Sequence, residues 1–140
     1  MRKRTSVMAM AGSLVALGLV LVLAPAASAG NVDYGISMTK LSNGKLWTSI
    51  RPDNVHEGSW WTMSETYEKT GGGNITAKLG FNYHGYSYDK GWFSQSAGTD
   101  HSEGFDWLGF DDCNDIVGWM AVQGQGTFYN APVSICDGSR

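Results

Sequence analysis

Apolar and polar residues alternate with a period of two through much of the chain after residue 30. The alternation is cleanest over residues 75–84, where the apolar positions are Ile75, Ala77, Leu79, Phe81 and Tyr83. A period of two is typical of a β-strand that turns one face toward a core and the other toward solvent. We therefore predict a strand here, with Tyr86 and Tyr88 extending it past Gly85.

A first hairpin is predicted at Asn43-Gly44, which separates two β-rich runs. Asn-Gly between such runs is the strongest short hairpin pattern. A two-residue turn at this pair places Leu41 opposite Leu46.

A second hairpin is predicted between the two cysteines of the chain, Cys113 and Cys136. A two-residue turn at Gly124-Gln125 sets these cysteines opposite each other at the far end of the ladder. The same register puts Pro132 where a ladder N–H is needed, so we expect a bulge or an edge position near Pro132.

Two further segments need a choice between structures. Ser59 to Thr70 fits a helical face through Trp60, Met63 and Tyr67, but its threonines and its β-rich neighbours favour a strand. Ser94 to Gly104 is polar, and we interpret it as a surface loop.

Short strands joined by glycine-rich turns predict an all-β fold, a small antiparallel β-sandwich or barrel with one disulfide. The start of the chain has another character: Met-Arg-Lys-Arg, an apolar run over residues 7–24 and an Ala-x-Ala ending at Ala29. This pattern indicates a signal peptide over residues 1–29, followed by one secreted β domain over residues 30–140. A transmembrane anchor is the alternative, but the run is short and contains glycines.

Cleavage after Ala29 removes three basic residues and leaves seven against 13 acidic ones, a net charge of −6. This excess of acidic residues argues against nucleic-acid binding and against stable attachment to an anionic membrane surface. Because exported proteins meet oxidising conditions, Cys113 and Cys136 are expected to pair.

Two sets of polar residues are candidates for chemistry. The acidic stretch over residues 100–115 could bind calcium, with Asp111 and Asp112 as the best ligand pair, but a solvated acidic loop with turn-forming aspartates is the simpler explanation. His56, His84 and His101 appear without a recognisable catalytic or zinc-binding spacing, so no cofactor is expected.

The aromatic residues carry the functional hypothesis, since all six Trp, six Tyr and five Phe follow the leader. Tyr86, Tyr88 and Trp92 flank the Asp89-Lys-Gly turn, and exposed rings there could stack on sugars. We therefore expect a non-catalytic binding protein for a carbohydrate or cell-envelope polymer.

Two alternatives remain open. One is an inhibitor or antagonistic toxin that acts on another protein or cell through the Ser94–Gly104 loop. The other is a small hydrolase that uses His101 or His56 with nearby carboxylates.

Overall fold

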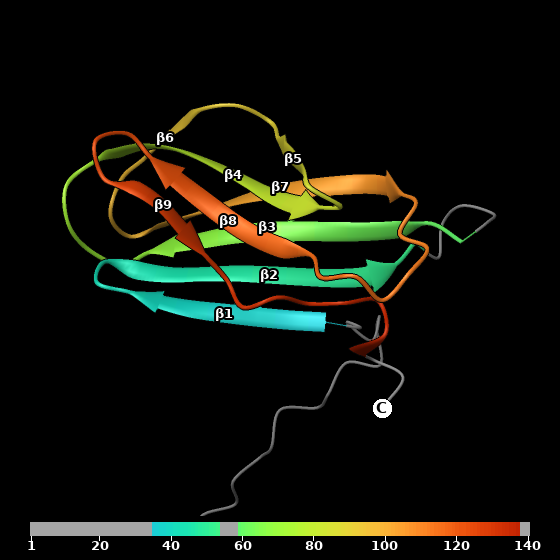
Figure 1. Ribbon diagram of the computed structural model, residues 1–140. Helices are drawn as coiled ribbons and strands as arrows, with labels where there is room; N and C mark the ends of the chain where they lie inside the picture. The colour runs from blue at the N-terminus through green and yellow to red at the C-terminus, as the bar shows by residue number, and fades with distance from the viewer. Residues whose placement is uncertain (1–34, 54–58, 138–140) are drawn as a thin grey trace, which may run out of the picture.

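The computed structural model describes residues 35–53 and 59–137, whose alternating sequence folds into two antiparallel β-sheets (Figure 1). The predicted signal peptide and His56 lie outside the described residues. The strands of this part of the chain are β1 Gly35–Leu41, β2 Gly44–Pro52, β3 Trp61–Lys69, β4 Ile75–Tyr83, β5 Tyr86–Asp89, β6 Phe93–Gln95, β7 Thr99–Leu108, β8 Val117–Val122 and β9 Gly126–Tyr129.

Sheet A has the strand order β1-β2-β3-β7, and sheet B has the order β5-β4-β8-β9, with β6 also paired to β4. The two sheets face each other as in a sandwich, and they do not close into a barrel (Figure 1). The all-β prediction is therefore confirmed. The strand prediction over residues 75–84 and the preference for a strand within Ser59–Thr70 are confirmed as β4 and β3.

The register predicted for the first hairpin is wrong by two residues. Leu41 pairs with Gly44 rather than with Leu46, so the turn consists of Ser42 and Asn43. Gly44 is needed inside β2, because a Cβ there would lie 2.1 Å from the backbone oxygen of Glu68 on β3. The glycine serves close strand packing and not the turn.

The second hairpin has a three-residue loop instead of the predicted turn at Gly124-Gln125, since Val122 pairs with Gly126. Gly124 and Gly126 both have positive φ, which a longer glycine-containing loop accommodates. Farther along, Ile116 pairs with Val133 in the predicted register. The ladder therefore shifts by one residue beside Pro132, where the irregularity was expected.

Two other predictions of chain path are wrong. Tyr86 and Tyr88 do not extend β4, because His84 and Gly85 both adopt positive φ and turn the chain back into β5. Ser94 to Gly104 is not a loop but contributes to β6 and β7. β7 is polar because it pairs only with β3, at the edge of sheet A, where much of the strand faces solvent.

The interior between the sheets contains two apolar clusters. One gathers around Ile50, Met63 and Phe81, and the other gathers around Leu46, Tyr67 and Leu79. Between them lies a buried polar layer, whose members are Thr48, Glu65 and Asn130. The alternation of β2 and β3 explains this arrangement, because Thr48 and Glu65 occupy the inward positions between the apolar ones.

Candidate binding surface

The face of sheet B that points away from sheet A carries a row of aromatic residues. On β4 the inward positions are Ala77, Leu79 and Phe81, so Lys78 and Asn82 point outward. On β8 and β9, Trp119 and Tyr129 are direct cross-strand partners on this outward face. Partners in this relation have Cβ atoms about 5 Å apart, so the two side chains lie side by side.

Trp119 lies flat across the sheet because its neighbour on β4 is a glycine. A Cβ at Gly80 would lie 2.2 Å from the backbone oxygen of Tyr88 on β5 and 2.5 Å from Cζ2 of Trp119, so any other residue would displace both the neighbouring strand and the ring. The indole Nε1 donates a hydrogen bond of 3.0 Å to Asn82 Oδ1. The ring is only 5% exposed, and it forms the floor of the surface rather than a projection from it.

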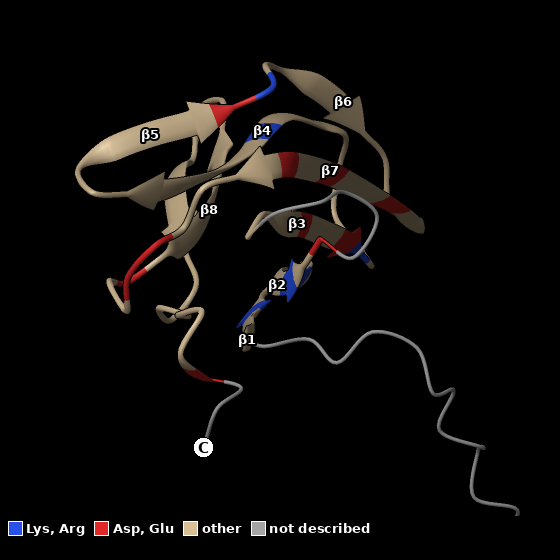
Figure 2. Ribbon diagram, turned by 90° about the vertical axis from the view of Figure 1, so that its right-hand side faces the viewer, with Lys and Arg blue, Asp and Glu red and all other residues tan. Residues whose placement is uncertain are grey.

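Lys78 links this floor to Trp92. Its ammonium group lies 5.3 Å from the ring centroid of Trp92 and 5.5 Å from that of Trp119, within the range of cation–π attraction. Lys78 also pairs with Asp89 at 3.2 Å, and Asp89 accepts a hydrogen bond from the backbone N–H of Gly91. The turn that carries Trp92 is thereby tied to the sheet. Figure 2, which colours Lys and Arg blue, shows a blue band on β4.

A groove of about 470 Å³ runs over this face. It is lined by Lys78, Asn82, Gly85, Ser87, Trp119, Ala121, Thr127 and Tyr129. Tyr129 is 55% exposed, and Trp92, next to Lys78, is 51% exposed. The groove therefore combines open aromatic rings with amide and hydroxyl groups that can donate and accept hydrogen bonds.

Tyr86 and Tyr88, which were predicted to act with Trp92, lie on the opposite face of sheet B. Tyr88 pairs with the inward-facing Phe81, and the two rings stack at 4.8 Å. We call this region the end cluster. Its rings around a hollow of about 260 Å³ are Phe81, Tyr83, Tyr88, Trp107 and Phe110, and Trp60 packs edge-to-face on Trp107 at 5.9 Å.

The three predicted site residues are all exposed, but the fold divides them between two surfaces. Trp92 lies beside the groove, next to its lining residue Lys78, whereas Tyr86 and Tyr88 belong to the edge that carries the end cluster. Trp119 and Tyr129 were not predicted as site residues, because apolar residues on both faces of residues 116–122 suggest a strand covered on both sides. The cross-strand pairing of Trp119 with Tyr129 is the feature that could have revealed them.

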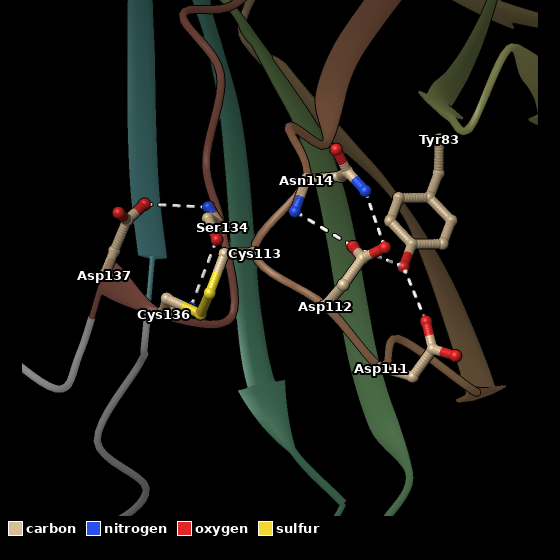
Figure 3. The surroundings of a disulfide bond; sticks show 8 residues. All are labelled: Tyr83, Asp111, Asp112, Cys113, Asn114, Ser134, Cys136 and Asp137. Atoms are coloured by element: carbon tan, nitrogen blue, oxygen red, sulfur yellow. Dashed lines mark hydrogen bonds between the residues drawn. A yellow bond between two sulfur atoms is a disulfide. The ribbon is translucent and has the colours of Figure 1, made fainter.

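The end of the acidic stretch, residues 111–114, forms a hydrogen-bonded cluster beside the disulfide (Figure 3). Asp112 accepts hydrogen bonds from the Asn114 backbone at 2.9 Å and from the Tyr83 hydroxyl at 3.1 Å, and it meets His84 Nε2 at 2.8 Å. These contacts, led by the Asn114 N–H, lower the pKa of Asp112. In the part of the chain that the structure describes, His84, Asp111 and Asp112 have ligand atoms within 4.8 Å of one another, so these three could hold a metal ion.

The disulfide between Cys113 and Cys136 is present as predicted. Its Cα atoms are 5.4 Å apart, and it ties the segment that precedes β8 to the segment that follows β9. Ser134 holds the second cysteine in place, because its hydroxyl accepts a hydrogen bond from the Cys136 N–H at 3.2 Å (Figure 3).

His101 lies next to a carboxylate, since its Nε2 is 2.8 Å from Glu103 Oε1. Its ring also stacks on Phe93 with centroids 3.5 Å apart. One face of the imidazole is therefore covered by an aromatic side chain.

Comparison with protein-family models, with curated proteins and with solved structures finds no match for this chain. Among the residues described, no helix has the length and apolar character needed to cross a membrane.

Proposed function

We propose that this is an exported, non-catalytic binding protein that holds a carbohydrate or cell-envelope polymer in the groove on the outer face of sheet B. The observation that carries the proposal is the arrangement of three aromatic side chains. Trp92 and Tyr129 are exposed beside a groove whose floor is Trp119.

This combination suits a sugar because a sugar ring has an apolar C–H face and a rim of hydroxyl groups. The open rings of Trp92 and Tyr129 offer stacking surfaces for the C–H face. Asn82, Ser87 and Thr127 line the groove and can exchange hydrogen bonds with the hydroxyl groups.

The charge of the groove supports a neutral ligand and binding without hydrolysis. Lys78 is the one charged residue among those that line it, and its charge is balanced by Asp89. Glycoside hydrolysis ordinarily requires two carboxyl groups that flank the bond to be cleaved. The groove lining offers no such pair.

Export is part of the same proposal. It rests on the leader pattern of residues 1–29 and on the disulfide, which persists in oxidising compartments.

The test is retention of the purified protein on insoluble polysaccharides and on cell-wall material. We expect Trp92→Ala and Tyr129→Ala each to lose about thirtyfold in affinity, which corresponds to about 2 kcal/mol for an aromatic anchor. Their melting temperatures should stay near that of the wild type, because both rings are half exposed. Full retention by both variants would contradict the assignment of the groove.

Trp107→Ala is the matched control, since it removes a ring of similar exposure from the end cluster. Trp107 also marks the second candidate function, a contact with a protein partner. It is a bulky residue held at a φ of 59°, a strained conformation that is often kept at ligand-contacting positions. Loss of retention in Trp107→Ala alone would move the site to the end cluster.

A further inference from the structure

The polar layer of the core brings together three side chains from distant parts of the chain. Thr48 on β2 and Glu65 on β3 are direct cross-strand partners on the inner face of sheet A. Asn130 follows β9 and reaches them from sheet B, where its backbone N–H donates to the Gly118 carbonyl at 2.9 Å. All three are at most 4% exposed.

The hydroxyl of Thr48 lies next to the carboxamide of Asn130. The Thr48 Oγ1 and Asn130 Nδ2 atoms are 2.7 Å apart. An amide C–N bond is about 1.33 Å long, so the carboxamide carbon lies within about 4 Å of the hydroxyl oxygen. Nucleophilic attack begins at a separation of about 3–3.5 Å, so the carboxamide carbon has to move toward the hydroxyl oxygen by rotation of the Asn130 side chain.

Glu65 lies against the same hydroxyl. A Cβ built on Gly118 would be 1.9 Å from Thr48 Oγ1 and 2.1 Å from Glu65 Oε1. Both oxygens thus converge on the space that the missing side chain of Gly118 leaves open. Within the described part of the chain, no group meets hydrogen-bond geometry with either carboxyl oxygen of Glu65 or with Asn130 Oδ1.

Glu65 is protonated at neutral pH. Burial raises its pKa to about 9, and the nearby Thr48 hydroxyl offsets only part of that effect. A neutral carboxylic acid has one oxygen that can accept a proton and one that can donate a proton. It can therefore take the proton of a hydroxyl nucleophile and supply one to a leaving group.

We propose that Thr48 and Asn130 are joined by an intramolecular ester bond that forms after folding, with Glu65 transferring the protons. Thr48 Oγ attacks the Asn130 carboxamide carbon, and the hydroxyl proton passes to the carbonyl oxygen of Glu65 as the hydroxyl oxygen of Glu65 gives its own proton to the amide nitrogen. The C–N bond breaks, and ammonia leaves. Glu65 ends as the neutral acid, and no oxidant, reductant or metal is consumed.

The surroundings suit such a bond. The apolar clusters on both sides keep water from the site, so hydrolysis of the ester would be slow. The link would join positions 82 residues apart and tie sheet A to the end of sheet B. Closing a long loop restricts the unfolded chain, as the disulfide does beyond the same end of β8 and β9.

The experiment uses the full chain expressed with its leader, purified, denatured and reduced before mass spectrometry. We expect an intact mass lower than that of the unlinked chain by one ammonia. After proteolysis, the peptide with Thr48 and the peptide with Asn130 should be recovered as one species that hydroxylamine separates. Because Asn43-Gly44 can also lose ammonia by succinimide formation, the linked peptides decide the outcome and the intact mass alone does not.

Thr48→Val keeps the shape of the side chain without the hydroxyl, and Thr48→Ser restores the nucleophile. The proposal requires separate peptides from Thr48→Val and from Glu65→Gln and linked peptides from Thr48→Ser. Separate peptides from the wild-type protein would overturn the proposal, whether or not the variants fold. A link that persists in Glu65→Gln would overturn the role of Glu65.

Discussion

Replacing Glu65 with glutamine should remove most of the dependence of folding stability on pH between pH 5 and pH 8. In the native protein the pKa of Glu65 is about 9, whereas the ordinary value is 4.5. Between these two values the native state keeps the proton and the unfolded state has lost it. The stabilisation is therefore fully present below pH 4.5 and is lost as the pH rises toward 9.

The size of the effect follows from the shift. Each pKa unit corresponds to about 1.36 kcal/mol, so the wild-type free energy of unfolding should fall by about 4 kcal/mol across these three pH units. Glu65→Gln has no proton to lose in the unfolded state. The groups nearest on the neighbouring strand, Glu103 and its partner His101, remain in both proteins. Their contributions cancel when the two slopes are compared.

The assay is urea unfolding followed by tryptophan fluorescence at pH 5, 6, 7 and 8. The slope of the unfolding free energy against pH is the observable, because loss of a hydrogen bond or of a cross-link would shift the variant by a similar amount at every pH. Parallel curves for the wild type and Glu65→Gln would refute the reasoning and would mean that Glu65 ionises in the folded protein.

Three further predictions follow from the packing. Gly118→Ala should lower the unfolding free energy by about 3 kcal/mol, because the added Cβ would clash within the polar layer. The control is Gly104→Ala, whose Cβ has open space around it, and this variant should change the unfolding free energy little in the same urea titration. Replacing both Cys113 and Cys136 with alanine should cost about 3 kcal/mol through loss of the closed loop, and an unchanged urea midpoint would disprove it. Gly80→Ala should displace Trp119 at the floor of the groove together with the adjoining backbone of β5, so retention on polysaccharide should fall. Retention at the wild-type level would show that this floor is not part of the site.

Much of the fold could be predicted from local patterns. The alternation over residues 75–84 predicted β4, because apolar and polar residues that alternate with a period of two can be recognised within one segment of the sequence. The oxidising compartment indicated by the leader predicted the pairing of Cys113 with Cys136. Details of register were less predictable, since Gly44 supports a close strand contact and not the turn that its sequence suggests.

The candidate site was predictable only in part. Exposed aromatics were expected, and Trp92 lies beside the groove, next to Lys78. Its companions Trp119 and Tyr129 come from strands that approach it only in the folded sheet. Tyr86 and Tyr88 were separated from Trp92 by a turn at His84-Gly85 that the alternating pattern did not reveal.

Glu65 illustrates which properties of a residue follow from the sequence and which depend on the tertiary structure. The sequence alone places Glu65 between Met63 and Tyr67 on one face of a strand, so a carboxyl group on an apolar face was already visible. Its full burial, its raised pKa and its meeting with Asn130 depended on sheet B closing over that face. Periodicity records which residues of one strand share a face, whereas the partners that cover the face come from segments whose approach is decided by packing.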